Sequence, residues 1–203
     1  MVFPCIFQEK WQKYLVVGDK CGILKNGLLL RFIYRSRKRK EAVRVNLKQL
    51  LEGISYEVQQ GTADVEISDF QYDSRKVEKD GLFVCITGFQ TDGHKYIPMA
   101  LEKGAVALLC EHRVENVPEG VTVLVTENNR IALALLSDHF YGHPSAEMNV
   151  IGVTGTNGKT STTYLMKSIL DRIGKKVGII GTIENRIGDE VLKAERTTPE
   201  SKE

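Results

Sequence analysis

A glycine-rich run near the end of the chain carries the residues best suited to chemistry. Residues 152–160 read Gly-Val-Thr-Gly-Thr-Asn-Gly-Lys-Thr, which we interpret as the GxxxxGK[ST] pattern of a phosphate-binding P-loop. Gly155 and Gly158 let the backbone turn so that its N–H groups point at phosphate oxygens. Lys159 would reach the β and γ phosphates, and Thr160 would offer its hydroxyl to Mg²⁺. The run predicts binding of a nucleoside triphosphate, and the loop alone does not separate ATP from GTP.

The elements around this run have the order that a P-loop requires. The expected elements are a strand at 148–153, a helix at 160–173, a strand at 176–180 and a hairpin across 187–189. Strand, helix and strand in this order form a parallel βαβ unit with a right-handed crossover. Thr198 and Pro199 predict the start of another helix just before the chain ends, so we expect a truncated second domain.

The preceding part of the chain also alternates strands with helices, which predicts an α/β fold. Strands are expected at 65–67, 82–86, 105–110 and 121–125, and helices at 47–54, 97–103 and 129–141. Asn46 and Asn128 can cap the first and last of these helices. The inner side of the last helix is predicted to consist of Ile131, Leu135, Leu136, His139 and Phe140.

A helix stop followed by turn formers at Gly142–Ser145 is the best linker candidate. We therefore place the domain boundary near residue 147. Residues 45–147 would form a small N-terminal α/β domain, and residues 148–203 would begin the P-loop domain.

Charge separates the first 44 residues from the rest. The chain has 28 Lys and Arg against 26 Asp and Glu, but residues 1–44 alone hold eleven basic and three acidic side chains. No period or aromatic platform organises this segment, so the basic run 35–40 is not expected to bind nucleic acid. We expect residues 1–44 to be a non-native or disordered extension, with Val45 as an alternative start.

Scattered cysteines and histidines indicate no further chemistry. The four cysteines, Cys5, Cys21, Cys85 and Cys110, have no CxxC pair and no histidine at ligand spacing, so neither a zinc site nor a disulfide framework is expected. The four histidines, His94, His112, His139 and His143, are expected to be structural. The apolar stretch 21–34 is interrupted by charges and too short to span a bilayer, and a cytoplasmic location is expected.

Several spaced motifs together resemble one family. The segment Gly155–Ser161 resembles the ATP loop of the Mur ligases. Upstream, 73–77, 80–84 and 88–94 resemble the UDP-sugar-binding domain of that family. The run Thr197-Thr198-Pro199-Glu200 resembles the branch that adds a diamino acid.

The resemblance implies roles for individual residues. It implies that ATP is held by Gly155, Thr156, Asn157, Gly158, Lys159, Thr160 and Ser161. It implies that Thr160 also binds Mg²⁺. It implies that the UDP-MurNAc-peptide is held by Tyr72, Ser74, Phe89, Gln90, Thr91, Thr197 and Thr198. Asp73 and Arg75 could serve either as a buried, turn-stabilising ion pair or as ligand contacts. No catalytic residue is assignable beyond Lys159, which would stabilise phosphate charge.

The implied activity is peptidoglycan precursor synthesis. The family uses ATP and Mg²⁺ to join L-Lys or meso-diaminopimelate to UDP-MurNAc-L-Ala-D-Glu through an acyl phosphate. By this resemblance the chain is a monomeric fragment, inactive alone, with no nucleic-acid or membrane partner. Two alternatives stay open: a Mur ligase that adds D-Ala-D-Ala, and a UDP-muramoyl-peptide binding module without catalysis.

Overall fold

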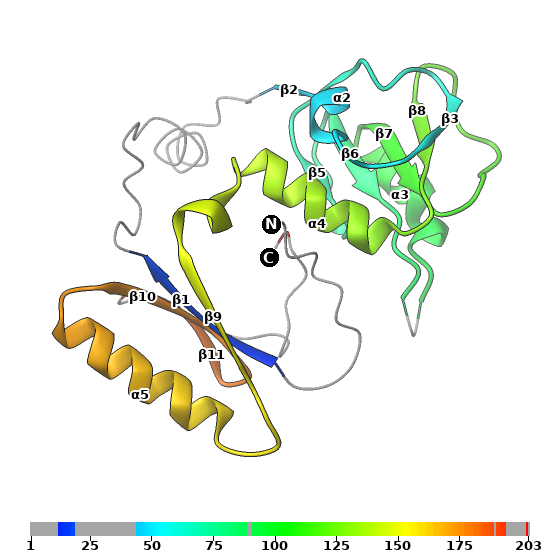
Figure 1. Ribbon diagram of the computed structural model, residues 1–203. Coiled ribbons are helices and arrows are strands. Elements are labelled where there is room, and N and C mark those ends of the chain that lie inside the picture. Colours follow the sequence, from blue (N-terminus) through cyan, green and yellow to red (C-terminus); the bar gives the residue numbers. More distant parts are fainter. Residues whose placement is uncertain (1–11, 19–43, 89–90, 189, 194–201, 203) are drawn as a thin grey trace. The chain divides into compact units, whose positions relative to one another are not determined.

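The computed structural model describes residues 12–18, 44–88, 91–188, 190–193 and 202 (Figure 1). Contacts divide them into two compact units. The first unit includes residues 44–140, and the second includes 12–18 and 141–193. The division falls beside the expected linker, a few residues before the boundary that we placed near residue 147.

A five-stranded sheet forms the centre of the first unit, in the order β3-β8-β7-β6-β5. Its strands are β3 (Glu57–Gln60), β5 (Phe70–Gln71), β6 (Gly81–Val84), β7 (Ala105–Cys110) and β8 (Thr122–Val125). The strands from β5 to β8 pair in parallel, and β3 joins β8 antiparallel. A separate two-stranded ladder pairs β2 (Val45–Asn46) with β4 (Glu66–Ile67). The carboxyl ends of β5, β6 and β7 therefore share one edge, which is where open α/β sheets bind ligands.

Helices cover both faces of this sheet, as the α/β prediction requires. They are α2 (Leu47–Leu50), α3 (Ile97–Glu102) and α4 (Asn129–Phe140). Leu82 and Val84 of β6 pack in the core cluster that contains α2 and α4. Phe83 and Cys85 point the other way, into the cluster that contains α3. All four side chains are buried, so β6 is a continuous apolar run with no polar alternation.

The start of α4 is fixed by two asparagines. Asn128 caps it as predicted, because its Oδ1 accepts hydrogen bonds from the N–H groups of Arg130 and Ile131 at 3.0 Å each. Asn129 is fully buried and donates from Nδ2 to the carbonyl oxygens of Cys85 (2.6 Å) and Leu109 (2.8 Å). Asn129 thereby ties the helix to the ends of β6 and β7.

Our prediction of the inner side of α4 was partly wrong. The fully buried residues of this helix are Asn129, Ala132, Leu133, Leu136 and Ser137, of which we predicted only Leu136. Two other predicted residues are half-buried and do face the core: Phe140 packs against Phe70, and His139 Nδ1 lies 2.8 Å from Leu50 O. Hydrophobicity could not identify Asn129 and Ser137 as buried, because both side chains are polar. Their hydrogen bonds to backbone carbonyls satisfy them inside the core: Ser137 Oγ donates to Leu133 O at 2.8 Å.

The second unit contains another five-stranded sheet, in the order β12-β11-β10-β1-β9. Its strands are β1 (Gln12–Gly18), β9 (Asn149–Thr154), β10 (Lys176–Ile180), β11 (Glu184–Ile187) and β12 (Glu190–Lys193). The helix α5 (Lys159–Arg172) packs on β9, β1 and β10. Buried Val177 and Ile179 of β10 form the core beneath it. The predicted hairpin is confirmed, because β11 and β12 pair antiparallel.

Strand β1 departs from our expectation for residues 1–44. It lies between β9 and β10 and pairs antiparallel with both, so β9 and β10 run parallel as predicted without being neighbours. Residues 14–17 are a continuous apolar run, so this segment lacks the alternation of apolar and polar residues by which a strand is recognised in a sequence. Residues 1–11 and 19–43 lie outside the described part of the chain.

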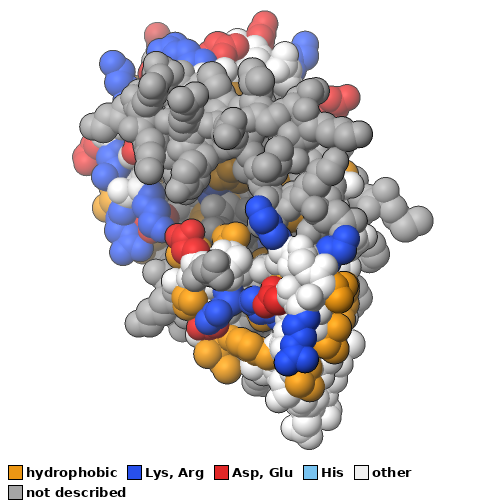
Figure 2. Space-filling model, turned by 90° about the vertical axis from the view of Figure 1, so that its left-hand side faces the viewer, with side chains coloured by type: hydrophobic (Ala, Val, Ile, Leu, Met, Phe, Trp, Pro, Cys, Tyr) orange, Lys and Arg blue, Asp and Glu red, His pale blue; other side chains and the backbone are white. Residues whose placement is uncertain are grey.

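The outer side of α5 exposes an apolar stripe. Leu165, Ile169 and Ile173 are 66%, 63% and 64% exposed, and their spacing of four residues places them in one row. Figure 2 shows hydrophobic side chains exposed beside Lys and Arg on one face of the molecule. Within the described residues, no helix has the length and apolar character needed to cross a membrane.

Candidate functional site

The glycine-rich loop joins β9 to α5, as its sequence predicted. Gly155 and Gly158 have φ angles of 145° and 78°, in the region that L side chains rarely adopt. A Cβ at Gly158 would meet nothing within 4 Å, so the backbone conformation and not crowding calls for glycine there. Residues 154–158 are exposed, whereas Lys159 is buried behind them. The loop is therefore open to a ligand from the solvent side.

Positive charge converges on this loop. Lys159 Nζ donates to the carbonyl oxygen of Gly155 and lies 3.4 Å from that of Thr156. The first turn of α5 forms directly behind it, since the N–H of Thr162 donates to Gly158 O at 2.8 Å. The helix N-terminus adds the positive end of its dipole. Phosphate oxygens could replace the loop carbonyls as acceptors for the Lys159 amine.

The spacing of the run differs from the general P-loop pattern. Five residues separate Gly152 from Gly158, whereas GxxxxGK[ST] has four and would need a glycine where Val153 stands. Gly152 consequently lies within β9, and the turn is made by Gly155 and Gly158.

Three of the expected sugar-nucleotide contacts lie at the carboxyl edge of the first unit. Tyr72 and Ser74 follow β5, and Thr91 follows β6. The buried Ser74 donates from Oγ to Met99 Sδ at 3.3 Å, and Thr91 Oγ1 lies 3.3 Å from the hydroxyl of Tyr96. These two partners lie three residues apart in the segment formed by η2 (Gly93–Tyr96) and α3. The structure therefore brings Ser74 and Thr91 to one exposed segment.

Four other expected contacts, Phe89, Gln90, Thr197 and Thr198, lie outside the described residues. Tyr72 is half-buried and packs against the core cluster of α2 and α4. The P-loop residues belong to the second unit and the sugar-nucleotide candidates to the first.

Asp73 and Arg75 form the turn-stabilising ion pair that was one of our two expectations, but the pair is not buried as expected, because the Arg75 side chain is 80% exposed. Asp73 Oδ2 and Arg75 Nη2 are 2.8 Å apart, and Asp73 Oδ1 accepts from the N–H of Arg75 at 3.0 Å. Asp73 thereby caps η1 (Ser74–Lys76). The hydrogen bond from the Arg75 side chain lowers the pKa of Asp73.

The structure brings together two cysteines and a histidine that the sequence analysis expected to be scattered. The sulfur atoms of Cys85 and Cys110 are 3.9 Å apart, and both residues are fully buried free thiols. A ring nitrogen of His94 and the two sulfurs all lie within 4.8 Å of one another. Sequence spacing missed this cluster because the residues lie on different elements. The available signal was that each cysteine lies at or next to the end of an apolar strand of an expected parallel sheet.

Hydrogen bonds organise the cluster. His94 Nδ1 lies 2.5 Å from Asp92 Oδ1, and His94 Nε2 accepts from the N–H of Glu111 at 3.0 Å. Burial opposes the charged imidazole, but hydrogen bonds with Cys110 and Asp92 raise the pKa of His94 overall. The hydrogen bond with Cys85 and the contact with His94 lower the pKa of Cys110 to about 6. The same pairing, together with burial, raises the pKa of Cys85.

Comparison with known proteins assigns both units to one family. The family model "Mur ligase family, catalytic domain" matches residues 66–141, and "Mur ligase middle domain" matches residues 153–203. The chain is 47% identical over 159 residues to UDP-N-acetylmuramoyl-L-alanyl-D-glutamate--2,6-diaminopimelate ligase 1 of Clostridium acetobutylicum, covering 78% of this chain and 33% of that protein. It is 44% identical over 161 residues to the corresponding ligase of Clostridium tetani, with the same coverage.

The chain spans about a third of the length of these curated relatives. A solved D-alanyl-D-alanyl ligase of this group from Acinetobacter baumannii aligns with a TM-score of 0.43 and 21% identity, covering 65% of this chain and 29% of that one. The assignment rests on the sequence matches, which fall in both units. This chain belongs to the Mur ligase family.

Proposed function

We propose that this chain supplies the sugar-nucleotide unit and the ATP loop of a ligase that joins a diamino acid to UDP-MurNAc-L-Ala-D-Glu. The observation that carries this is the exposed loop 155–158 in front of the buried Lys159, in a chain 47% identical to a diaminopimelate ligase. Because the relatives' names specify 2,6-diaminopimelate, we propose that amino acid over L-Lys. The location is cytoplasmic and the state monomeric in this proposal.

The loop residues would act on phosphate charge. In this reaction the substrate carboxylate attacks the γ-phosphorus with ADP leaving, and the amine then attacks the acyl carbon with phosphate leaving. Lys159, the loop N–H groups and the start of α5 would hold the negative oxygens in place during the first step. Thr160, in the first turn of α5, fits one position on Mg²⁺, an ion that takes its other ligands from water and phosphate. Mg²⁺ would supply further neutralisation of phosphate charge.

The sugar-nucleotide part would bind at the carboxyl edge of the first unit. Ser74 offers a hydroxyl beside the exposed side chain of Met99, and Thr91 offers one beside the exposed ring of Tyr96. An aromatic ring with nearby hydroxyls suits a uracil base, which needs stacking and a few hydrogen bonds. Phe89, Gln90, Thr197 and Thr198 complete this proposal as implied by the family resemblance.

Calorimetry with Mg–ATP tests the loop. Replacing Lys159 by Ala removes a charge-assisted hydrogen bond, so the Kd should rise about 10–100-fold. Lys176→Ala, which changes an exposed lysine of the same unit, is the matched control and should leave the Kd unchanged. Equal binding by the Lys159→Ala variant would contradict the nucleotide assignment.

Titration with UDP-MurNAc-L-Ala-D-Glu tests the other unit. Ser74→Ala should weaken binding roughly tenfold, the worth of about one hydrogen bond, and leave Mg–ATP binding intact. Ser68→Ala is the control, because the Ser68 hydroxyl donates to Lys79 O at 2.8 Å within the same unit and has no proposed ligand role. The 203-residue chain spans about a third of the length of its curated relatives, and alone it should form no amide. Amide formation by this chain would contradict that expectation.

A further inference from the structure

We propose that Cys85, Cys110 and His94 together bind one thiophilic divalent cation, Zn²⁺, at the carboxyl edge of the first unit's sheet. Two sulfurs and an imidazole nitrogen are a soft donor set that zinc prefers. The proposal is independent of the ligase function, because none of the three residues belongs to the ATP loop or to the proposed sugar-nucleotide contacts.

Strand register places the two thiols. Val84 of β6 pairs with Leu109 of β7, so the next residues, Cys85 and Cys110, stand side by side on the face that α3 covers. Their sulfurs are 3.9 Å apart. Two thiolates on one tetrahedral zinc, each about 2.3 Å from the metal, are about 3.8 Å apart. The pair is therefore already spaced for a shared ion.

The third ligand has the support that zinc-binding histidines usually have. His94 Nδ1 is held by the Asp92 carboxylate at 2.5 Å, which fixes the ring and leaves Nε2 as the ligating nitrogen. Nε2 now accepts the N–H of Glu111, and the metal would replace that hydrogen bond. A buried cysteine pair that only filled space would need no such oriented imidazole beside it.

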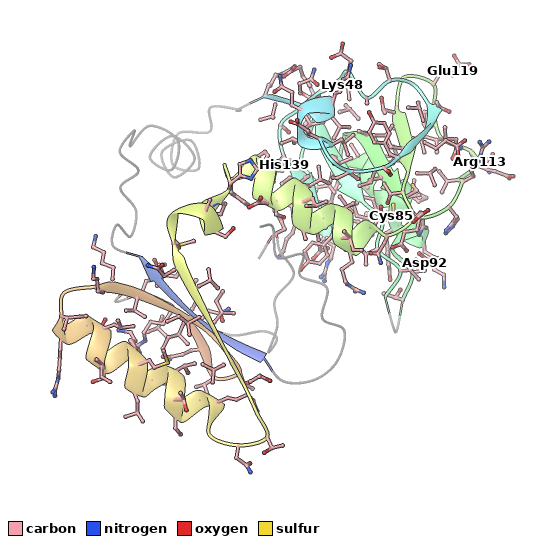
Figure 3. All side chains as sticks on the ribbon, viewed as in Figure 1. Lys48, Cys85, Asp92, Arg113, Glu119 and His139 are labelled. Atoms are coloured by element: carbon pink, nitrogen blue, oxygen red, sulfur yellow. The ribbon has the colours of Figure 1, made fainter. Side chains whose placement is uncertain are left out.

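The cluster has an approach from the surface. The thiols are fully buried, but the Asp92 side chain is 33% exposed. His112 is also exposed, and its ring lies 3.9 Å from that of His94. Figure 3 shows Cys85 and Asp92 close together at the end of the unit where α4 begins. An ion could enter between Asp92 and His112, which with His94 also offer ligand atoms within 4.8 Å of one another.

A bound ion would join three separate pieces of backbone. Cys85 precedes the loop 86–93, His94 follows it, and Cys110 ends the neighbouring strand. Metal that binds only the folded chain raises its stability by mass action. We therefore expect Zn²⁺ to raise the Tm of the chain.

Cobalt is the probe, because Co²⁺ bound to thiolates absorbs in the near ultraviolet. The reduced 203-residue chain, titrated with Co²⁺ without oxygen, should show this band with one ion per chain, and Zn²⁺ should abolish it. Cys110→Ser removes one of the two thiolates and should lose most of the band. His94→Gln keeps both thiolates but removes a ligand, and Asp92→Asn removes the support of that ligand, so each should weaken Co²⁺ affinity about 10–100-fold. The matched control Cys5→Ser/Cys21→Ser, which changes the other two cysteines, should keep the band.

The unmodified chain makes the test decisive even if a variant fails to fold. Absence of the band in the folded, reduced wild-type chain overturns the proposal. Loss of the band in the Cys5→Ser/Cys21→Ser control also overturns the proposal. So does a chain that forms a Cys85–Cys110 disulfide when oxidised but binds no metal when reduced.

Discussion

The side-chain amine of Lys159 donates to the carbonyl oxygen of Gly155, at the other end of the same loop. The lysine is therefore held in place, buried, before any ligand arrives. Side chains that are already ordered lose less entropy on binding. The loop and the Lys159 ammonium are thus already ordered for phosphate binding.

This geometry predicts that positive charge alone is insufficient. Lys159→Arg keeps the charge but inserts a larger, planar group into a buried position that fits a compact ammonium. We expect the variant to fold and to lose Mg–ATP binding nearly as completely as Lys159→Ala. Calorimetry measures the loss, and circular dichroism confirms folding; near-normal affinity would show that only charge matters.

Gly158 offers a test of backbone conformation. Its φ of 78° is left-handed and its Cβ position is empty, so Gly158→Ala should destabilise the second unit by about 1 kcal/mol from backbone strain alone. Gly158→Asn should cost less, because asparagine enters this region more readily. Urea unfolding of both variants gives the order; equal losses would argue against backbone strain as the cause.

Among the polar residues of the first unit, we expect replacement of Asn129 to lower the free energy of unfolding most. Asn129→Leu leaves Cys85 O and the Thr126 hydroxyl without their buried partner, for a loss of roughly 3 kcal/mol. The neighbouring Asn128→Ala removes only a helix cap and should cost about 1 kcal/mol. Denaturant unfolding compares them, and the reverse order would contradict this account of the α4 start.

Asp73 should make the stability of the first unit depend on acid pH. Its pKa is lowered by the hydrogen bond from Arg75, so the folded state favours the carboxylate. This stabilisation is fully present above the unfolded pKa of about 3.9 and is lost as pH falls through the lower folded value. Asp73→Asn should flatten that part of the profile, and Arg75→Met should flatten it similarly. Denaturant unfolding measured from about pH 2 to about pH 6, a range that spans the folded and unfolded pKa of Asp73, would detect either effect.

Sequence patterns predicted the bounds of three elements closely. The strand β7 and the strand β10 have the predicted bounds, and α5 differs by one residue at each end. The strand β1 was missed because its short apolar run has no alternation, and because the strands that it pairs with lie far along the chain. The pairing of Cys85 with Cys110 was missed for the same reason, since strand register joins them across 25 residues. Local patterns thus predicted the P-loop, which is contiguous, and not the cluster assembled from three segments.

The apolar stripe of Leu165, Ile169 and Ile173 bears on how the protein behaves at the bench. Contiguous hydrophobic surface of this kind is an aggregation hazard when water alone covers it. Concentrated samples of the 203-residue chain should bind reporter dyes such as ANS and precipitate readily. Changing the three side chains to glutamine should restore solubility while the underside of α5, with Leu170 against Val177, stays packed.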